Sequence, residues 1–303
     1  MIKNKNFLQF RDLTREEIGK IFERTTTLKK DFKKRNMAKS LDNRTLVLIF
    51  EKQSTRTRLA FEAGMQHLGG NTIFLNSSDS QLGRGEPVED SARVISRMCD
   101  LIMIRTHEHS FLEKFAKHSE VPVINGLTND HHPCQLLADL YTFIEKRGSL
   151  ENKRVAWIGD SNNVLASWVQ AAELVGFELS ISSPPGFEGV DYKSGHYSDF
   201  AKVRRFSDPS EAAVGADLVL TDVWTSMGFE NEAKQRHELF QKWQVNEKLM
   251  ELAHPNALFM HCLPAHRGEE VTSGVIDGPS SVVWDEAENR LHTQKALLEI
   301  MIS

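Results

Sequence analysis

The chain has 303 residues, more than one ordinary hydrophobic core accommodates, and this length predicts two domains of about 150 residues each. Hydrophobic residues make up 40% of the chain and charged residues 26%, as is typical of a soluble globular protein. The formal net charge of -5 argues against nucleic-acid binding as the main function, and no stretch approaches the ~18 consecutive apolar residues of a membrane span. The first ten residues lack the apolar region of a signal peptide, so we expect a cytoplasmic protein.

Short apolar, β-favouring runs alternate with helical patterns along the chain, and they predict nine strands: 45–50, 72–75, 101–105, 121–125, 155–159, 178–182, 218–221, 258–261 and 281–284. This alternation predicts an α/β fold with two doubly wound domains, each a mainly parallel sheet flanked by helices. Pro133 and the amphipathic stretch that follows it predict a long helix that ends at Gly148 and links the domains.

The segment FEKQSTRTR at residues 50–58 predicts a strand that leads through a short loop into a helix start. The first N–H groups of a helix that begins at Ser54 have no intrahelical partners, and the helix dipole adds partial positive charge there. Two arginines and three hydroxyls within five residues supply further donors, so the segment predicts a phosphate-binding site. The alternative is an ordinary Ser-capped helix with solvated arginines.

Further polar clusters follow predicted strands, where ligands bind in open parallel sheets. The clusters are RTH at 105–107, NGLTNDHHPCQ at 125–135, GDSNN at 159–163, DVWTSMG at 222–228 and HCLPAHRG at 261–268. Taken alone, several clusters have simpler interpretations: HHP as a helix entry, Asp222 as a turn residue and Cys262 as a buried structural thiol. GDSNN resembles a truncated glycine fingerprint, which is weak evidence for a dinucleotide. Together, however, the clusters predict one ligand-binding cleft.

The chain closely resembles the ornithine carbamoyltransferases in five motifs: STRTR at 54–58, RTHEH at 105–109, HPCQ at 132–135, DVWTSMG at 222–228 and HCLPAHRG at 261–268. The resemblance runs in order from near residue 7 to the C-terminal helix. STRTR and HPxQ are shared with aspartate carbamoyltransferases and therefore indicate the carbamoyl phosphate half of the site. The SMG loop and HCLP are the ornithine-type motifs, and both are intact.

The resemblance implies transfer of a carbamoyl group from carbamoyl phosphate to L-ornithine, giving L-citrulline and phosphate in arginine metabolism, with no cofactor and no metal. It implies a carbamoyl phosphate-binding domain at residues 1–147, against which a C-terminal helix at about 288–303 packs, and an ornithine-binding domain at 148–287. The implied carbamoyl phosphate ligands are Ser54, Thr55, Arg56, Thr57, Gln81, Arg105, His132, Gln135, Cys262, Leu263 and Arg290. The implied ornithine ligands are Asn163, Asp222, Ser226 and Met227.

The resemblance also implies a homotrimer, because Gln81 would enter the carbamoyl phosphate site of a neighbouring subunit. The loop at 76–87 that carries Gln81 is polar and contains glycine, so the alternative is a solvated surface loop. The partners that we expect are thus two small molecules and further copies of the chain, and neither nucleic acid nor membrane.

These residue types suit a direct attack on the carbamoyl carbon without a covalent enzyme intermediate. The side-chain amine of ornithine resembles that of Lys, with a pKa of about 10.4, and must lose a proton before it attacks. Asp222 and Cys262 would orient the amine, while Arg105, His132 and Thr57 would stabilise the tetrahedral oxyanion. Cys262 has a second interpretation as a nucleophile with His261 or His266 as its base, but alternation along a strand argues against His261 in that role.

Three other functions remain open at this point. Another carbamoyltransferase, acting on aspartate, putrescine or an acylated ornithine, is disfavoured by the intact SMG and HCLP motifs. A nucleotide-dependent oxidoreductase is disfavoured because no complete glycine fingerprint is present. A non-catalytic protein that retains the fold would be favoured by loss of a ligand residue, and none is lost. Three cysteines, Cys99, Cys134 and Cys262, without metal-ligand spacing predict neither a disulfide framework nor a zinc site.

Overall fold

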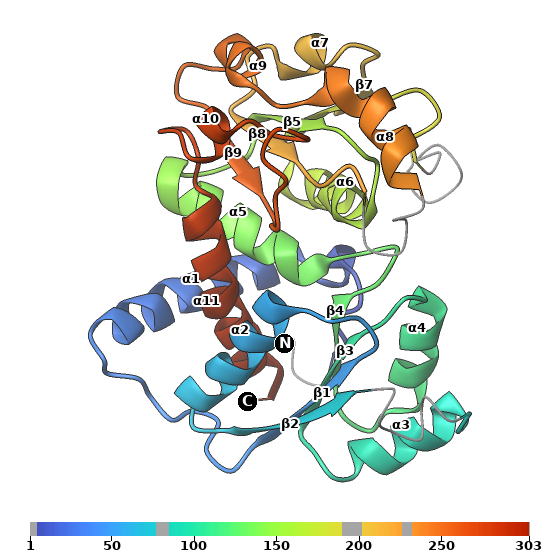
Figure 1. The fold of residues 1–303 in the computed structure, drawn as a ribbon. Helices are drawn as coiled ribbons and strands as arrows, with labels where there is room; N and C mark the ends of the chain where they lie inside the picture. The colour runs from blue at the N-terminus through green and yellow to red at the C-terminus, as the bar shows by residue number, and fades with distance from the viewer. Residues whose placement is uncertain (1–4, 77–84, 190–201, 226–231, 303) are drawn as a thin grey trace. The chain divides into compact units, whose positions relative to one another are not determined.

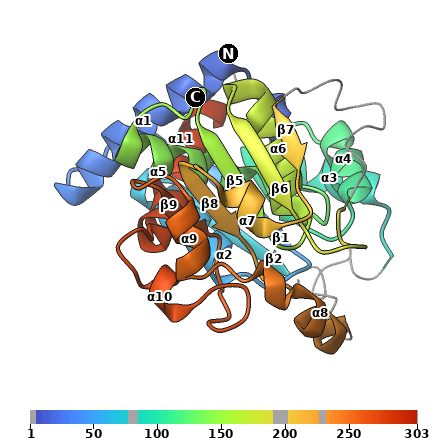
Figure 2. The same cartoon turned by 90° about the horizontal axis from the view of Figure 1, so that it is seen from above.

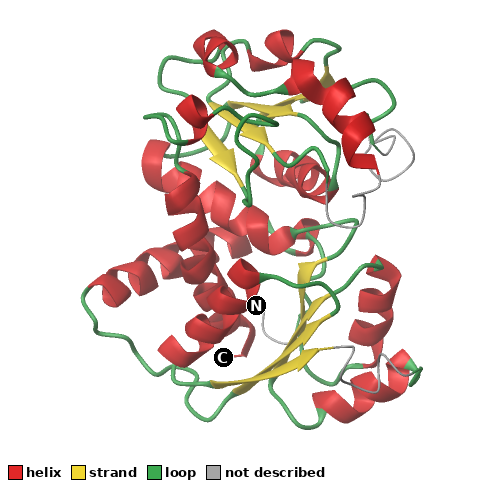
Figure 3. Ribbon diagram, in the orientation of Figure 1, coloured by secondary structure: helices red, strands yellow, loops and turns green. Residues whose placement is uncertain are grey.

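The computed structural model describes residues 5–76, 85–189, 202–225 and 232–302. Within them, helices and strands alternate along the chain (Figures 1 and 3). The chain divides into two compact units, of which the first comprises Met1–Tyr141 with Glu288–Ser303 and the second comprises Thr142–Ala287. Each unit has its own parallel sheet, so the predicted α/β fold class with two sheets is confirmed.

A four-stranded sheet in the order β2-β1-β3-β4 forms the centre of the first unit. Its strands, all parallel, are β1 (Thr45–Phe50), β2 (Asn71–Asn76), β3 (Leu101–Arg105) and β4 (Val123–Leu127). All five residues of β3 are buried, as expected for a parallel strand with both faces covered. The strand order reverses between β1 and β3, and ligands bind at such a switch point in open α/β sheets.

Helices cover both faces of this sheet, with α2 on one face and α3 and α4 on the other (Figure 1). The helical elements that lie in or enter the first unit are η1 (Phe10–Asp12), α1 (Arg15–Lys33), α2 (Thr55–His67), α3 (Val88–Ser96), α4 (His109–His118), α5 (Pro133–Arg147) and α11 (Val283–Ile302). The helix predicted from Ser54 is confirmed, because α2 begins at Thr55 and Ser54 Oγ accepts the Thr57 N–H at 3.2 Å. The boundary between the units falls within α5, as expected of the predicted linker helix, and within α11.

The second unit contains a five-stranded parallel sheet in the order β7-β6-β5-β8-β9 (Figure 2). Its strands are β5 (Arg154–Ile158), β6 (Glu178–Ser182), β7 (Val203–Arg205), β8 (Leu218–Thr221) and β9 (Leu258–His261). Helix α6 (Asn163–Val175) covers one face, and α7 (Pro209–Ala213) and α9 (Glu247–Leu252) cover the other (Figure 1). The remaining elements are α8 (Ala233–Phe240), η5 (Gln241–Trp243) and α10 (Ser273–Ile276). The order reverses between β5 and β8, which is the switch point of this unit.

Most of the predicted strands are confirmed. The predictions at 45–50, 101–105, 178–182, 218–221 and 258–261 match the observed bounds, and those at 72–75 and 155–159 differ by one residue at each end. Strand β4 begins two residues later than predicted, at Val123. Strand β7 was not predicted, because two of its three residues are exposed arginines and form no apolar run.

The predicted strand at 281–284 is wrong. Ser281 forms only an isolated bridge with Phe259, and Val283 already begins the long helix α11. A short apolar run such as SVVW does not distinguish a strand from the buried start of a helix, and here the helix that follows decides the structure. Among the residues that the structure describes, no helix is both long and apolar enough to span a bilayer.

Candidate active site

In the first unit, basic and polar side chains from four elements meet beyond the carboxyl ends of the strands. Arg105 is the last residue of β3, His132 directly precedes α5, and Arg290 lies on α11. These three side chains are at most 5% exposed. We call Arg56, Arg105, His132, Gln135 and Arg290 the cationic cluster.

Hydrogen bonds fix the Arg290 guanidinium within this cluster. Its Nη1 donates to Gln135 Oε1, and its Nη2 donates to Thr57 Oγ1 at 3.1 Å. Gln135 in turn donates through Nε2 to Asp139 Oδ1 at 2.8 Å, so its carbonyl oxygen faces the guanidinium. A chain of bonds from Asp139 to Thr57 therefore connects α5, α11 and α2 within the first unit.

His132 is held in its neutral form. Burial lowers its pKa well below the usual value, and the positive charges of Arg290, Arg105 and Arg56 lower it further. The imidazole therefore offers one N–H donor and one acceptor, and it adds no charge to a site that already holds three guanidinium groups. This combination suits a ligand with several negative oxygens and a carbonyl group.

The two arginines of STRTR have different surroundings. Arg56 is half-buried and acts electrostatically on His132. Arg58 instead pairs with Glu62 at 2.9 Å and lies over the Phe74 ring, with its guanidinium carbon 3.7 Å from the ring centroid. Of the two guanidinium donors that the sequence offered for an anion, the structure brings only Arg56 to the cationic cluster.

In the second unit, the carboxylate of Asp222 accepts three hydrogen bonds. The donors are the Asn162 Nδ2 at 2.6 Å, the backbone N–H of Val223 at 2.8 Å and the Cys262 thiol at 3.2 Å. Asp222 follows β8, Cys262 follows β9, and Asn162 caps α6 after β5, so three neighbouring strand ends supply the group. All three donors are neutral in these bonds, and the carboxylate, which is 7% exposed, is their common acceptor.

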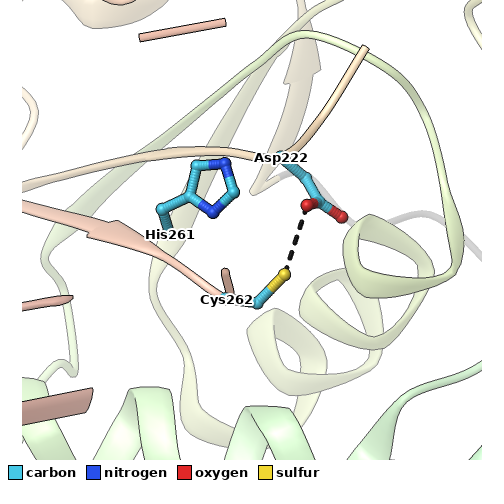
Figure 4. Close-up of side chains that lie close together, drawn as sticks. All are labelled: Asp222, His261 and Cys262. Atoms are coloured by element: carbon cyan, nitrogen blue, oxygen red, sulfur yellow. Dashed lines mark hydrogen bonds between the residues drawn. The ribbon is translucent and has the colours of Figure 1, made fainter. Parts of the chain in front are cut away.

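Cys262 and His261 lie close together beside Asp222, and Figure 4 shows the three side chains. The backbone N–H of Leu263 donates to His261 Nδ1 at 2.9 Å, so the ring proton is on Nε2, which donates to Glu270 Oε1 at 3.0 Å. The first of these bonds accompanies a left-handed backbone at Leu263, where φ is 59° and the following peptide bond to Pro264 is cis. His261 thus holds the turn that carries the thiol.

This geometry tests two other roles for Cys262, as a nucleophile with His261 as its base and as a metal ligand together with Asp222 and His261. Ligand atoms of Asp222, His261 and Cys262 lie within 4.8 Å of one another, closer than the alternation of side chains along a strand suggests. The reason is that β9 ends at His261 and the chain turns at Leu263. His261 is nevertheless a poor base or metal ligand, because its two nitrogens are engaged by Leu263 and Glu270, while the thiol donates to Asp222.

The remaining predicted site residues fall into two groups. Ser54, Thr55, Asn163 and Leu263 lie in the described loops and helix starts, whereas Gln81, Ser226 and Met227 lie outside the described residues. The sequence interpretation gave no role to Asn162, although it lies in the GDSNN cluster, and it missed Asp139 and Glu270, which lie outside the predicted clusters. All three act through other residues. Asn162 had a usable signal, since Asn directly before an apolar helix is a preferred N-cap.

Two family models match the chain. The carbamoyl phosphate-binding domain of the aspartate/ornithine carbamoyltransferases matches residues 5–145, and the aspartate/ornithine-binding domain matches residues 151–301. The chain belongs to the aspartate/ornithine carbamoyltransferase family.

Individual relatives are close over the full length. The ornithine carbamoyltransferase of Methylobacillus flagellatus is 61% identical, with 98% of this chain and 97% of the relative covered. The crystal structure of ornithine carbamoyltransferase from Burkholderia thailandensis matches with a TM-score of 0.91 and 54% identity over 98% of each chain. The ornithine carbamoyltransferase from Pyrococcus furiosus gives a TM-score of 0.94 and 45% identity over 99% of this chain and 98% of the other. Within the family, the chain groups with the ornithine carbamoyltransferases.

Proposed function

We propose that the chain transfers the carbamoyl group of carbamoyl phosphate to the side-chain amine of L-ornithine, which gives L-citrulline and phosphate. The observation that carries this proposal is the pairing of opposite chemistries in one chain. The first unit contains three guanidinium groups around a neutral histidine, and the second contains a buried carboxylate with a thiol bonded to it. Carbamoyl phosphate is an anion with a carbonyl group, and ornithine is an amino acid with two amines.

The residues proposed for carbamoyl phosphate lie mainly in the first unit. The N-terminus of α2, from Ser54 to Thr57, and the Arg56 guanidinium would bind the phosphate oxygens. Arg105, His132 and Gln135 would bind the carbamoyl group, and Arg290 would add charge from α11. This assigns carbamoyl phosphate binding to residues 1–147 together with the C-terminal helix at about 288–303.

The residues proposed for ornithine lie in the second unit, at residues 148–287. Asp222 would pair with a cationic amino group, which suits a carboxylate whose bonded donors are neutral. Asn163, Ser226 and Met227 would bind the other polar groups of the amino acid. Cys262 and Leu263 would lie next to the reacting amine and the carbamoyl group.

The proposed reaction is a direct attack of the amine on the carbamoyl carbon, followed by loss of phosphate from a tetrahedral intermediate. The neutral side-chain amine attacks and the carbonyl electrons move to oxygen, which forms the C–N bond of a tetrahedral intermediate. The intermediate then collapses as the C–O bond to phosphate breaks, and the departing phosphate takes the proton that the amine nitrogen loses. Arg105 and the N–H of His132 stabilise the oxyanion, and the cationic cluster stabilises the departing phosphate. A neutral His132 donates to the oxyanion at neutral pH without competing with the arginines for the phosphate.

A thiol nucleophile is the second candidate chemistry, and the hydrogen bonds disfavour it. A nucleophilic Cys262 needs a base that accepts its proton, but its bonded acceptor is the Asp222 carboxylate, and His261 is bonded to Leu263 and Glu270. We therefore propose that Cys262 binds and orients, without a covalent intermediate.

The working unit that we propose is a cytoplasmic homotrimer with sites shared between subunits through Gln81. Support comes from exposed apolar side chains on three elements of the first unit: Leu59 on α2, Ile73 on β2, and Val94 on α3 with Met98 just after it. Such residues suit contact between copies. Mixing inactive Arg56→Ala chains with Gln81→Ala chains should restore activity above that of either parent, because some interfaces combine intact partners. Verified mixed trimers that gain no activity would contradict shared sites.

Citrulline formation tests the proposed function directly. The purified chain is supplied with carbamoyl phosphate and, in separate reactions, with ornithine, aspartate or putrescine. Citrulline with ornithine and little product with the other amines is expected. Equal or greater turnover of aspartate or putrescine would overturn the assignment of the acceptor.

A further inference from the structure

Arg236 is a buried arginine of the second unit that belongs to no motif and to no predicted ligand set. It lies on α8, which follows the segment after β8 that carries Asp222. Its side chain is only 8% exposed, and a buried guanidinium is costly unless all its contacts are well arranged. The contacts therefore indicate what this charge is for.

The guanidinium joins two loops at the switch point of the sheet. Its Nη1 lies 3.1 Å from Asp160 Oδ2, in the loop after β5, and donates to the carbonyl oxygen of Trp224 at 2.9 Å, in the loop after β8. Its Nε donates to Glu232 Oε2 at 2.9 Å, at the N-cap of α8. The Arg236 side chain thus bonds the loop after β5, the loop after β8 and the N-cap of its own helix.

Aromatic rings restrict the position of this side chain. The guanidinium carbon lies 4.6 Å from the Phe187 ring centroid, within the range of a cation–π contact. The Phe187 and Phe240 rings pack with their centroids 5.0 Å apart, and the Phe240 and Trp224 rings pack with their centroids 6.0 Å apart. This site therefore uses a planar group that stacks on a ring and donates several hydrogen bonds in a fixed geometry, and a lysine ammonium cannot do both.

The two loops that Arg236 joins also supply the second-unit site. Asp160 lies two residues before Asn162, whose Nδ2 donates to Asp222 at 2.6 Å, and Trp224 lies two residues after Asp222. The backbone N–H of Asn162 donates to the carbonyl oxygen of Asp160 at 3.1 Å, so Asp160 and Asn162 share one turn. A displacement of either loop would change the distance between Asn162 and Asp222.

Charge adds a second reason for a cation at this point. Asp160 is bonded to Arg236 and also lies within the electrostatic influence of two further carboxyl groups, Asp222 and Glu232. Burial raises the pKa of Asp160 to about 6, the charges of Asp222 and Glu232 raise it as well, and Arg236 opposes these effects. Arg236 is therefore the cation that allows Asp160 to be ionised so close to Asp222.

We propose that Arg236 is a positioning residue for the amino-acid side of the site: its bonds to Asp160 and Trp224 hold the loops after β5 and β8 so that Asn162 remains bonded to Asp222. This inference rests on the proposed function, because it assigns Asp222 to ornithine. Arg236 touches neither substrate in this proposal. It acts only through the two loops.

The test is steady-state kinetics of Arg236→Gln and Arg236→Lys in the full-length enzyme, with ornithine and carbamoyl phosphate varied separately. Arg236→Gln should raise KM for ornithine about tenfold or more, and Arg236→Lys, which keeps the charge but loses the planar fork, should raise it severalfold. The dissociation constant for carbamoyl phosphate, measured by calorimetry without ornithine, should change less than about twofold, because its proposed ligands are mainly in the first unit.

Arg154→Gln is a matched control in the same unit. Arg154 belongs to β5, is exposed, and faces Glu178 at 3.6 Å, so its loss removes the same charge without touching the site loops. Its kinetic constants should stay within about twofold of wild type. If Arg236→Gln does not fold, Arg236→Lys and Asp160→Asn replace it, and each should raise KM for ornithine.

Different results would contradict the proposed function and the proposed role of Arg236. A wild-type enzyme that makes no citrulline contradicts the proposed function. The inference is overturned if the wild type is active and the Arg236 variants melt at a lower temperature but keep the wild-type KM for ornithine, measured well below that temperature. Arg236 would then be a structural residue only. Equal losses for ornithine and carbamoyl phosphate would overturn it too.

Discussion

Helices α2 and α6 occupy equivalent places in their sheets, because each follows the strand at which the strand order reverses, yet their first turns are chemically opposite. Ser54 accepts one backbone N–H at the start of α2, and Arg56 lies within that turn. Asn162 accepts two backbone N–H groups at the start of α6, at 2.9 and 3.2 Å, and its amide nitrogen donates to the Asp222 carboxylate. In the proposed function, the first helix start binds an anion, and the second supports a carboxylate that pairs with a cation.

The comparison indicates that the dipole of a helix at a switch point does not by itself set which ligand group the helix start suits. The dipole is similar in both helices, so the side chains around it decide what binds. A two-pronged cap such as Asn162 satisfies more of the helix end than Ser54 does, and the carboxylate beside it makes the field unfavourable for phosphate. Substitutions in each turn should therefore affect one substrate and spare the other.

The largest effect is expected for Asp222→Asn, which keeps the shape of the side chain and removes its charge. Breaking a buried charge pair costs about 3–5 kcal/mol, so kcat/KM for ornithine should fall by roughly two to three and a half orders of magnitude. Calorimetry should find carbamoyl phosphate binding within about twofold of wild type. Near-normal turnover of ornithine would show that Asp222 does not bind the amino group.

Arg56→Ala should give the complementary result. Hydrogen bonds to charged groups contribute about 1.5–3 kcal/mol, so carbamoyl phosphate should bind ten- to over a hundredfold more weakly. Arg58→Ala is the matched control, because Arg58 is occupied by Glu62 and Phe74, and its loss should change binding much less. An unchanged affinity in Arg56→Ala would remove α2 from the phosphate site.

The pH dependence should report the ornithine amine and not the histidine of the cationic cluster. Because the attacking amine must be neutral, kcat/KM for ornithine should rise by up to about tenfold per pH unit between about pH 6 and pH 9. His132 should add no step in this range, since burial and three arginines hold its pKa well below its ordinary value and it is neutral throughout. A profile that is flat over the same range would exclude amine deprotonation from the reaction path.

The smallest effect is expected for Asn162→Ser, which retains a capping oxygen for α6 but removes the donor to Asp222. Loss of one hydrogen bond to a carboxylate that keeps two others should raise KM for ornithine roughly three- to tenfold. The melting temperature should stay close to wild type, because Ser and Asn cap helices about equally well. A large loss of stability with unchanged KM would mean that Asn162 matters only as a cap.

Most strands of the fold could be predicted from the local pattern of apolar and turn residues. Strands 45–50, 101–105, 178–182, 218–221 and 258–261 were predicted with their observed bounds, because a buried parallel strand is an unbroken apolar run between turn residues. The run at 281–284 misled the prediction since its residues suit either a strand or a buried helix start. Strand β7 was missed since its two exposed arginines, Arg204 and Arg205, carry no such pattern.

The sequence by itself determined the family, most of the strands in their order and the motif residues, because these are local properties of contiguous segments. It also placed Ser54 at a helix start and the polar clusters at strand ends, which are local consequences of periodicity and capping. Only the tertiary structure decided how those segments combine: that Arg58 turns to Glu62 and Phe74, that His261 bonds Leu263 and Glu270, and that Arg236 joins Asp160 to Trp224. These bonds depend on where folded strands and loops bring distant side chains, and a hydrogen bond requires its atoms within about 3 Å with the right alignment, which no spacing along a sequence specifies.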